Sequence, residues 1–173
     1  MLRRAPRTRL AVRHAYWALQ KRKYDALAKS IATEARTVLF EAYGGRSYAC
    51  SPKALYQEML GDERFAGCEL VWAFREGAVP SDEPDLEHAT IVKRGSSAYF
   101  ETLARAGCIV VNNRLPEYVY PKDDQVYVQC WHGTPLKRLG YDVEIEMESA
   151  LNTTNELAER FGMDARKWTH LLS

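Results

Sequence analysis

The sequence predicts an α/β fold in which helices cover both faces of a parallel β-sheet. Short runs rich in β-branched and aromatic residues alternate with segments of helical spacing. The runs are almost continuously apolar, which is typical of strands buried on both faces of a sheet. The composition, 46% hydrophobic and 27% charged in 173 residues, fits one globular domain of ordinary size.

Five strands are expected, and the run Cys-Ile-Val-Val-Asn-Asn is the clearest of them. The predicted strands are 37–42, 69–74, 90–94, 108–113 and 125–131. Their order among the helices is Rossmann-like, and such sheets bind ligands beyond the carboxyl ends of the strands. A site is therefore expected among the loops that follow the strands, namely 43–51, 75–89, 95–97, 112–118 and 132–135.

Helices are expected between these runs. Residues 8–32 carry apolar side chains at close to helical spacing, with Arg and Lys between them: Val12, Tyr16, Leu19, Leu27 and Ile31. A second helix is expected with Ser51 as its N-cap and Pro52 at its first helical position. The turn 95–97 caps a third helix. The second helix is expected to end near residue 60, and the third helix to span 98–106. A short helix is expected at 135–140, a longer one at 144–161, and a further element from residue 168.

The charge is unevenly distributed. The net charge is +1, but residues 1–23 hold eight Lys and Arg and no acid, so the other 150 residues carry −7. A basic segment of this kind indicates an anionic partner surface, either lipid or nucleic acid. Nucleic acid is the weaker interpretation, because it needs a basic groove or stacking aromatic residues as well. No secretory signal or bilayer-length apolar run is visible, and the four cysteines form no CxxC pair, so a cytosolic chain is expected.

The segment after the last predicted strand carries the most specific pattern. His132 follows the strand, Gly133 permits a tight turn, and Thr134 is a predicted N-cap. Lys137 and Arg138 lie in the first helical turn, where cations oppose the helix dipole unless an anion such as phosphate binds there. A histidine beside such a site could move a proton. The structural alternative is a capping histidine and a solvated basic face.

Three weaker patterns have structural alternatives too. Gly45 and Arg46 in the first glycine loop could hold a phosphate, or the loop could be a tight turn. Cys130 and His132 could pair as thiol and imidazole or as metal ligands, although a buried strand residue explains Cys130 as well. The acidic segment 82–88 could bind a divalent ion, or it could be a solvated loop.

The string Trp-His-Gly-Thr-Pro-Leu-Lys at 131–137, with Gly140 after it, resembles the signature of the CDP-glycerol glycerophosphotransferase family. These are the teichoic acid primases and polymerases of Gram-positive bacteria. Phe40-Glu41 and the string Ser-Pro-Lys-Ala-Leu-Tyr at 51–56 resemble the family's opening strand and the helix that follows it. The resemblance extends over roughly residues 36–142.

This resemblance implies a GT-B-like fold, in which two Rossmann-type domains face a cleft. It implies that a hydroxyl of a lipid-linked glycerol phosphate attacks the β-phosphate of CDP-glycerol and releases CMP. No cofactor beyond the substrate CDP-glycerol and no metal ligand is implied. His132 would be the general base, and the acceptor or phosphate would be bound by Gly133, Thr134, Lys137, Arg138, Gly45 and Arg46.

The basic segment would hold the protein on the anionic inner leaflet, as a cytoplasmic protein peripheral to the plasma membrane. The residues assigned to membrane contact are Arg9, Arg13, Trp17, Lys21 and Arg22. The alternative is a polar helix that packs on the domain.

Three segments are expected. Residues 1–34 would be the basic helical arm, 35–143 the Rossmann-like acceptor-side domain, and 144–173 a helical crossover toward a C-terminal donor-binding domain that this sequence does not contain. The chain alone is then expected to be inactive. Two other hypotheses stay open: a non-catalytic module of the same family that binds membrane or polyanion, and an unrelated Rossmann-like nucleotide-binding enzyme.

Overall fold

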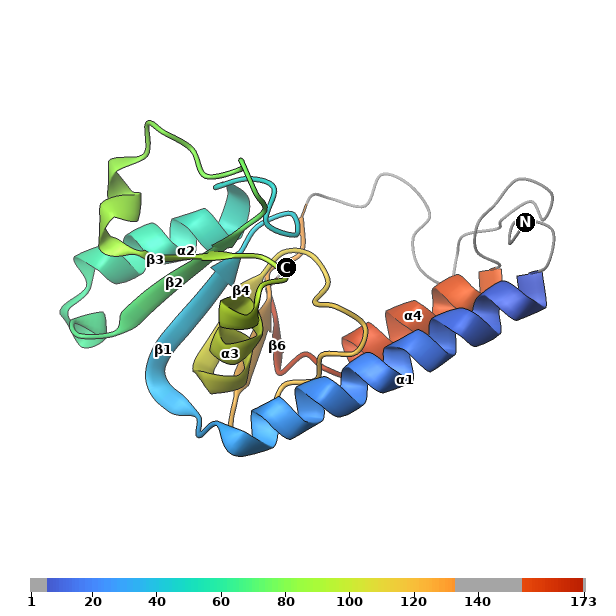
Figure 1. Ribbon diagram of the computed structural model, residues 1–173. Coiled ribbons are helices and arrows are strands. Elements are labelled where there is room, and N and C mark those ends of the chain that lie inside the picture. Colours follow the sequence, from blue (N-terminus) through green and yellow to red (C-terminus); the bar gives the residue numbers. More distant parts are fainter. Residues whose placement is uncertain (1–5, 133–153, 173) are drawn as a thin grey trace.

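The computed structural model describes residues 6–132 and 154–172, and its centre is a six-stranded parallel sheet (Figure 1). The strands lie in the order β3-β2-β1-β4-β5-β6, so the predicted parallel α/β sheet is confirmed. Their bounds are β1 Glu34–Glu41, β2 Glu69–Phe74, β3 Thr90–Lys93, β4 Ala106–Val111, β5 Val126–Gln129 and β6 His170–Leu171. The chain crosses β1 between β3 and β4, which makes β1 and β4 neighbours.

All five predicted strands form, each within a few residues of its expected range. The element expected from residue 168 is the short edge strand β6. Thr169 attaches it to β5, because its hydroxyl accepts a bond from Tyr127 N (2.7 Å) and its own N donates to Tyr127 O (3.0 Å). The sequence did not specify a strand here because two exposed residues carry no periodicity.

The helices are α1 Pro6–Ser30, α2 Cys50–Gly61, α3 Ser97–Arg105 and α4 Thr154–Ala165, with 3₁₀ turns η2 Glu63–Phe65 and η3 Pro84–His88. Ser96 caps α3 by accepting from Tyr99 N at 3.2 Å, as predicted. The predicted cap of α2 is wrong: Ala49 is the N-cap, and Ser51 lies inside the helix. The expected helix at 135–140 and residues 144–153 lie outside the described residues.

Alternating strand residues form two cores, one on each face of the sheet. On one face Leu39 of β1 and Ile109 of β4 pack with α1 and α3. On the other face Phe40 and Trp72 pack with Tyr56 of α2, and the Phe40 and Trp72 rings stack with centroids 5.5 Å apart. Both faces of the sheet are therefore covered by packed apolar side chains, as the apolar strands predicted.

Helix α1 lies on the α3 side of the sheet (Figure 1), and its Trp17 is contacted by Arg160 of α4. Only its last turns enter the core, through Tyr24 and Ala28. The predicted apolar stripe is not the buried face along its whole length, since Val12, Tyr16 and Leu19 are more than half exposed. They lie on the part of α1 that extends beyond the sheet.

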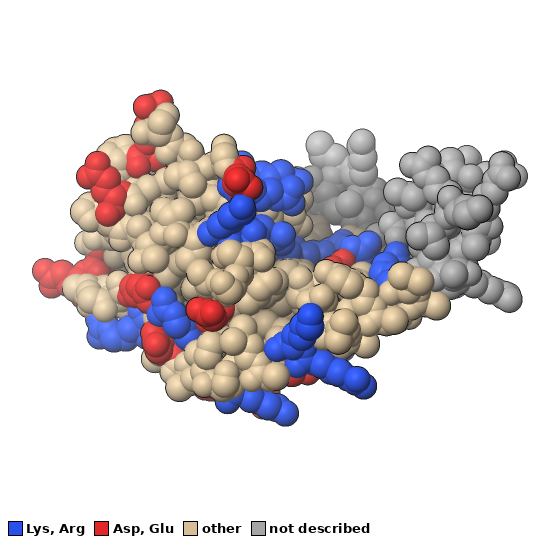
Figure 2. All heavy atoms as spheres, in the orientation of Figure 1, with Lys and Arg blue, Asp and Glu red and all other residues tan. Residues whose placement is uncertain are grey.

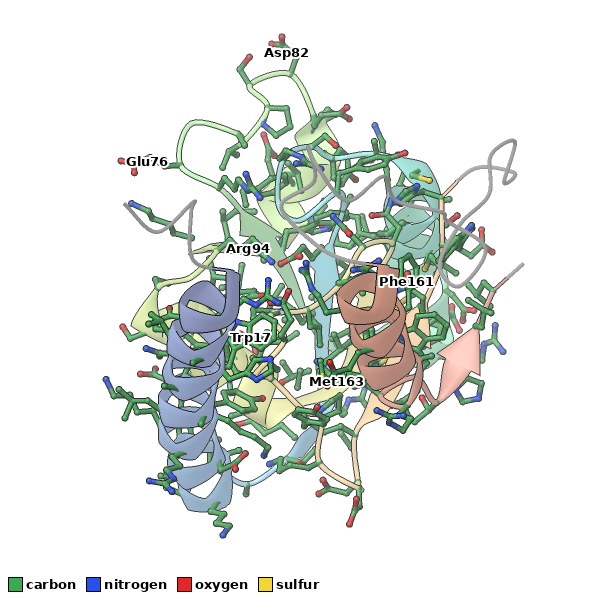
Figure 3. The ribbon with its side chains drawn as sticks, turned by 90° about the vertical axis from the view of Figure 1, so that its right-hand side faces the viewer. Trp17, Glu76, Asp82, Arg94, Phe161 and Met163 are labelled. Carbon is green, nitrogen blue, oxygen red and sulfur yellow. The ribbon has the colours of Figure 1, made fainter. Side chains whose placement is uncertain are left out.

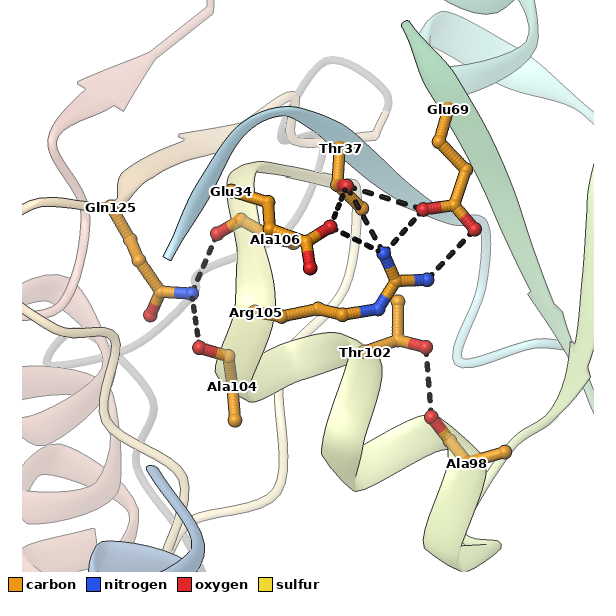
Figure 4. Close-up of polar contacts among 9 residues, drawn as sticks. All are labelled: Glu34, Thr37, Glu69, Ala98, Thr102, Ala104, Arg105, Ala106 and Gln125. Carbon is orange, nitrogen blue, oxygen red and sulfur yellow. Dashed lines mark hydrogen bonds and ion pairs between the residues drawn. The ribbon is translucent and has the colours of Figure 1, made fainter. Parts of the chain in front are cut away.

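At the amino edge of the sheet, polar groups bind one another (Figure 4). The Arg105 guanidinium, at the end of α3, donates to Glu34 of β1 at 2.8 Å and to both carboxylate oxygens of Glu69 of β2. The Thr37 hydroxyl donates to the same two carboxylates. Gln125 Nε2 donates to the Ala106 carbonyl at 2.6 Å. This network, which we call the amino-edge network, joins β1, β2 and α3 at the start of the strands.

Candidate functional site

The carboxyl ends of β1 and β4 meet at the point where the strand order reverses direction. The chain after β1 turns toward β2, and the chain after β4 turns toward β5, so a crevice is expected between the two loops. Asn112 bridges them: its Oδ1 accepts a bond from Tyr43 N at 2.7 Å. Asn112 is 1% exposed, and its Nδ2 has no hydrogen-bond partner among the described residues.

The loop after β1 depends on its two glycines. Gly44 and Gly45 have φ of +66° and +75°, and Gly45 N closes the turn on Ala42 O at 2.9 Å. A Cβ at Gly45 would lie 3.0 Å from Arg94 Cδ and 3.1 Å from Arg75 N. A side chain therefore has neither the backbone conformation nor the space at this position.

Two arginines from the ends of neighbouring strands contact this loop. Arg75, directly after β2, donates from Nε to Gly44 O (2.9 Å) and from its backbone N to Gly45 O (2.6 Å). Arg94, after β3, donates from Nε to Glu41 Oε2 at 2.9 Å. Figure 2 shows Lys and Arg side chains gathered over the loops at this end of the strands.

Glu41 is a buried carboxylate at the end of β1. It is 1% exposed, and its Oε2 also accepts the Tyr99 hydroxyl at 2.9 Å. Its Oε1 has no hydrogen-bond partner among the described residues. Burial raises the pKa of Glu41 above its usual range, although the Arg94 charge acts in the opposite direction. The carboxylate holds Arg94 against the glycine loop.

His132 is exposed at the carboxyl end of the neighbouring strand β5, as predicted. Its ring lies 5.5 Å from the Tyr43 ring and stacks on Trp131, with centroids 6.0 Å apart. Trp131 has φ of +54°, and its N donates to Gln129 Oε1 at 3.1 Å. Gln129 Nε2 in turn donates to Asn113 O at 3.1 Å. The end of β5 is thus fixed against the end of β4.

Of the residues assigned from the sequence, the structure brings Gly45 and His132 to this edge of the sheet. Gly45 follows Tyr43 by two residues in the chain, and the His132 ring lies next to the Tyr43 ring. Arg46 is exposed on the glycine loop, where its N donates to Ala42 O at 3.2 Å. The remaining candidates, Gly133, Thr134, Lys137 and Arg138, lie outside the described residues.

Sequence reasoning named these loops but did not assign Arg75 and Asn113, whose side chains both lie close to Gly44. The signal that could have found them is their position directly after or two residues after an apolar strand, combined with a strand order that places β1 between β2 and β4.

The weaker patterns have structural explanations. Cys130 lies in the core, and burial raises the pKa of its thiol to about 12, while His132 is exposed, so the two do not form a pair. In the acidic segment Glu83 binds Lys53 at 2.7 Å, and Asp85 accepts from Gln57 at 2.6 Å. Within residues 6–132 and 154–172, no group of three His, Cys, Asp or Glu side chains could hold a metal ion.

In the basic arm some of the side chains assigned to membrane contact are exposed, and others contact residues of the protein itself. Arg22 is exposed, and Lys21 binds Asp25 at 2.7 Å. Trp17 points from α1 toward α4 (Figure 3), where the Arg13 and Arg160 guanidinium carbons lie 5.1 and 5.9 Å from its ring centroid. The side chain of Arg9 is not described. Among the described helices, none has the length and apolar character needed to cross a membrane.

Comparison with known proteins gives one consistent family. The profile described as CDP-Glycerol:Poly(glycerophosphate) glycerophosphotransferase matches residues 24–173. The chain is 33% identical over 153 residues to the teichoic acid poly(glycerol phosphate) polymerase of Staphylococcus epidermidis, covering 87% of this chain and 20% of that protein. It is 32% identical to the protein of the same name from Bacillus subtilis, covering 85% of this chain and 19% of the relative.

Solved structures agree with the sequence matches. The wall teichoic acid polymerase TagF superimposes on 96% of this chain with a TM-score of 0.72 and 30% identity. A TagF variant soaked with CDPG gives a TM-score of 0.75 at 29% identity. The chain covers 41% of each of these structures. It therefore spans a fifth of the first curated relatives and two fifths of the solved ones.

Proposed function

Because the chain belongs to the CDP-glycerol:poly(glycerophosphate) glycerophosphotransferase family, we propose that its domain takes part in the transfer of glycerol phosphate to an acceptor in teichoic acid synthesis. The relatives named as teichoic acid polymerases support this class of reaction. The domain would supply the acceptor side, and the attack of an acceptor hydroxyl on the β-phosphate of CDP-glycerol would release CMP.

The observation that carries the proposal is the position of His132. It is exposed at the carboxyl edge, beside the Tyr43 ring and next to the point where the strand order reverses. A neutral imidazole there takes the proton of an incoming hydroxyl as the oxygen attacks phosphorus, and general-base catalysis of this kind contributes about 10²–10⁴-fold. The Tyr43 and Trp131 rings both lie next to the imidazole.

The donor would bind to a further domain. The polymerases that this chain matches are much longer, and the chain corresponds to 20% and 19% of the first two. We infer that His132 and its edge form one wall of a cleft, and that a second domain holds CDP-glycerol opposite it. The division into arm, acceptor-side domain and crossover, with bounds 1–34, 35–143 and 144–173, belongs to this proposal.

Helix α1 would contact the inner face of the plasma membrane. Its exposed part combines apolar side chains, Val12, Tyr16 and Leu19, with the exposed cation Arg22. A helix that exposes both apolar and basic side chains can rest on a lipid surface, where each basic residue near an anionic leaflet contributes about 1 kcal/mol. Vesicle binding at low salt, compared with and without residues 1–23, tests this role. Equal vesicle binding of the proteins with and without residues 1–23 would contradict this membrane role.

A transfer assay tests the function itself. The chain would be incubated with radiolabelled CDP-glycerol and a lipid-linked glycerol phosphate acceptor, alone and together with the C-terminal part of the TagF relative. Product formed only when the C-terminal part of TagF is added would support the proposal that this chain is the acceptor-side half of the enzyme. Product from the chain alone would place a donor site within these residues. Absence of product in both cases, with CD showing folded proteins and intact TagF active in parallel, would contradict the proposal.

A further inference from the structure

We propose that Arg75 and Asn113 form a phosphate-binding cradle over Gly44, which holds the phosphate of the acceptor's terminal glycerol phosphate unit beside His132. The cradle lies at the meeting point of three loops, those after β1, β2 and β4. The identity of the anion as the acceptor's phosphate rests on the proposed function. The anion site itself rests on the geometry alone.

The two donors converge on one point. A Cβ built on Gly44 would lie 3.5 Å from Asn113 Nδ2 and 3.6 Å from Arg75 Nη2. Both distances are ordinary contact distances, and because residue 44 is a glycine, no side chain occupies the position between the two nitrogens. An amide N–H and a guanidinium on either side of a glycine match two oxygens of one phosphate.

Each donor is held by its other polar atoms. Arg75 uses Nε and its backbone N to bind the carbonyls of Gly44 and Gly45, which fixes the direction of the guanidinium. Asn113 Oδ1 accepts a bond from Arg114 N at 2.8 Å, and its backbone oxygen accepts from Gln129. The amide can therefore present only Nδ2 to the loop. Donors that need no rearrangement bind an anion with little loss of conformational entropy.

The local charge favours an anion. Arg75 is always protonated, and the hydrogen bonds of its Nε go to a carbonyl, so no carboxylate neutralises it through that atom. The buried carboxylate of Glu41 is paired with Arg94, although its charge also acts on Arg75. Asn112, next to Asn113, adds a buried amide near the Cys50 thiol. The edge thus has amide groups and positive charge on the same loops.

The position relative to His132 explains which part of a substrate would bind here. Gly44 follows Tyr43, whose ring contacts the His132 ring at 5.5 Å. In a terminal glycerol phosphate unit, the free hydroxyl is separated from the phosphate by the three-carbon glycerol chain. A phosphate in the cradle would direct the hydroxyl toward the edge of the sheet on which His132 lies. Arg75 and Asn113 would be positioning residues for the acceptor, and His132 the group that touches the reacting oxygen.

The test is an NMR titration of the 173-residue chain with sn-glycerol 3-phosphate, with glycerol as the uncharged probe. Glycerol 3-phosphate is expected to shift the amide signals of the three loops, and glycerol is not. Arg75→Gln and Asn113→Ala are each expected to weaken binding about tenfold, as for the loss of one charge-assisted hydrogen bond. The matched control is Arg166→Gln, an exposed arginine at the opposite edge of the sheet, which should bind like the wild type.

Two further variants separate the site from unspecific attraction. Arg75→Lys keeps the positive charge but loses the planar guanidinium with its several N–H donors. Its affinity for glycerol 3-phosphate should therefore lie between those of the wild type and Arg75→Gln. Asn113→Asp places a carboxylate in the cradle and should bind more weakly than Asn113→Ala. Wild-type affinity in Arg75→Gln, or an equal loss in Arg166→Gln, would overturn the cradle. Thermal unfolding checks that every variant is folded.

A competition arm identifies the source of the phosphate. CDP-glycerol should not displace glycerol 3-phosphate from the isolated chain, and displacement that depends on Arg75 would assign the cradle to the donor and overturn the acceptor assignment. Failure here is distinguishable from failure of the proposed function. If His132→Ala loses transfer but Arg75→Gln does not affect binding, only the cradle is refuted. If Arg75→Gln weakens binding but His132→Ala keeps transfer, only the role of His132 is refuted.

Discussion

The two edges of the sheet use polar residues in opposite ways. At the amino edge Arg105, Glu34, Glu69 and Thr37 bind one another. At the carboxyl edge Glu41 Oε1 is buried without a hydrogen-bond partner among the described residues, and Tyr43, Cys50 and Trp131 have positive φ although they are not glycines. A left-handed conformation costs such residues roughly 1–2 kcal/mol each. The amino edge thus stabilises the fold, whereas the carboxyl edge contains conformations that cost stability.

This difference predicts that mutations at the two edges separate function from stability. Changes at the carboxyl edge should alter binding or transfer and leave unfolding nearly unchanged. Changes at the amino edge should lower stability and leave the site intact in the folded protein. The four predictions below test the comparison, from the largest expected effect to the smallest.

The largest effect is expected for His132→Ala at the carboxyl edge. In a transfer-competent protein that contains these residues, transfer should fall by about 10²–10⁴-fold, because the acceptor hydroxyl loses its proton acceptor. His132 is exposed, so the unfolding temperature should not change. Radiolabel transfer and thermal unfolding measure the two quantities. Unchanged turnover would remove His132 from the mechanism.

The cysteines allow a second comparison, between a thiol at the carboxyl edge and thiols in the strands. Cys50 is exposed, and although partial burial raises its pKa, hydrogen bonds from Tyr43 and Ser51 bring it below the ordinary value of 9.0. Burial raises the pKa of Cys108 to about 11 and that of Cys130 to about 12. Iodoacetamide at neutral pH should therefore modify Cys50 at least about 10²-fold faster, since each unit changes the thiolate fraction tenfold.

Peptide mass spectrometry at increasing reaction times would measure these rates. In urea all four cysteines should react alike, which is the control for sequence effects. Equal rates at Cys50 and Cys130 in the folded protein would contradict the difference between the edge and the strands.

Gly107→Ala tests the amino edge. A Cβ at Gly107 would lie 2.7 Å from Ala35 Cα and 2.8 Å from Glu34 O, both of them backbone atoms of β1. We expect a loss of about 1–3 kcal/mol in the free energy of unfolding, because strands β1 and β4 must move apart. Urea unfolding measures it. Gly61→Ala, where a Cβ meets nothing within 4 Å, is the matched control and should not destabilise. Equal stability of the two variants would contradict the close contact.

Arg105→Gln gives the smallest effect, about 1 kcal/mol at neutral pH, as for a partly exposed ion pair. Hydrogen bonds from Arg105 lower the pKa of the Glu69 carboxyl below its ordinary 4.5. A lowered pKa stabilises the folded state fully above pH 4.5, and this contribution is lost as the pH falls through the folded-state value. The difference in stability between wild type and variant should therefore shrink below pH 4.5. A difference that stays constant down to pH 3 would contradict the linkage.

The sequence predicted the elements better than the site, for a physical reason. Strands such as 69–74 and the cap Ser96 are determined by neighbours in the chain, so local pattern was enough. The position of Arg75 and Asn113 next to Gly44 depends on strand order and on loop conformation, which bring together residues far apart in the sequence. His132 and Gly45 lie at the carboxyl edge, as expected, because each follows a predicted strand. The predicted α2 cap was wrong because the helix starts two residues earlier than expected, at Cys50, which adopts a φ of +63°.

Helix α1 has a mechanical consequence. It has 25 residues and spans roughly 37 Å at 1.5 Å per residue, and only its C-terminal turns, through Tyr24 and Ala28, are anchored in the core. Its contacts with α3 and the Trp17 contact with α4 prevent it from swinging freely. If its outer turns rest on a membrane, the helix acts as a rigid spacer. The height and tilt of His132 above the lipid surface would then be set by the length of one helix.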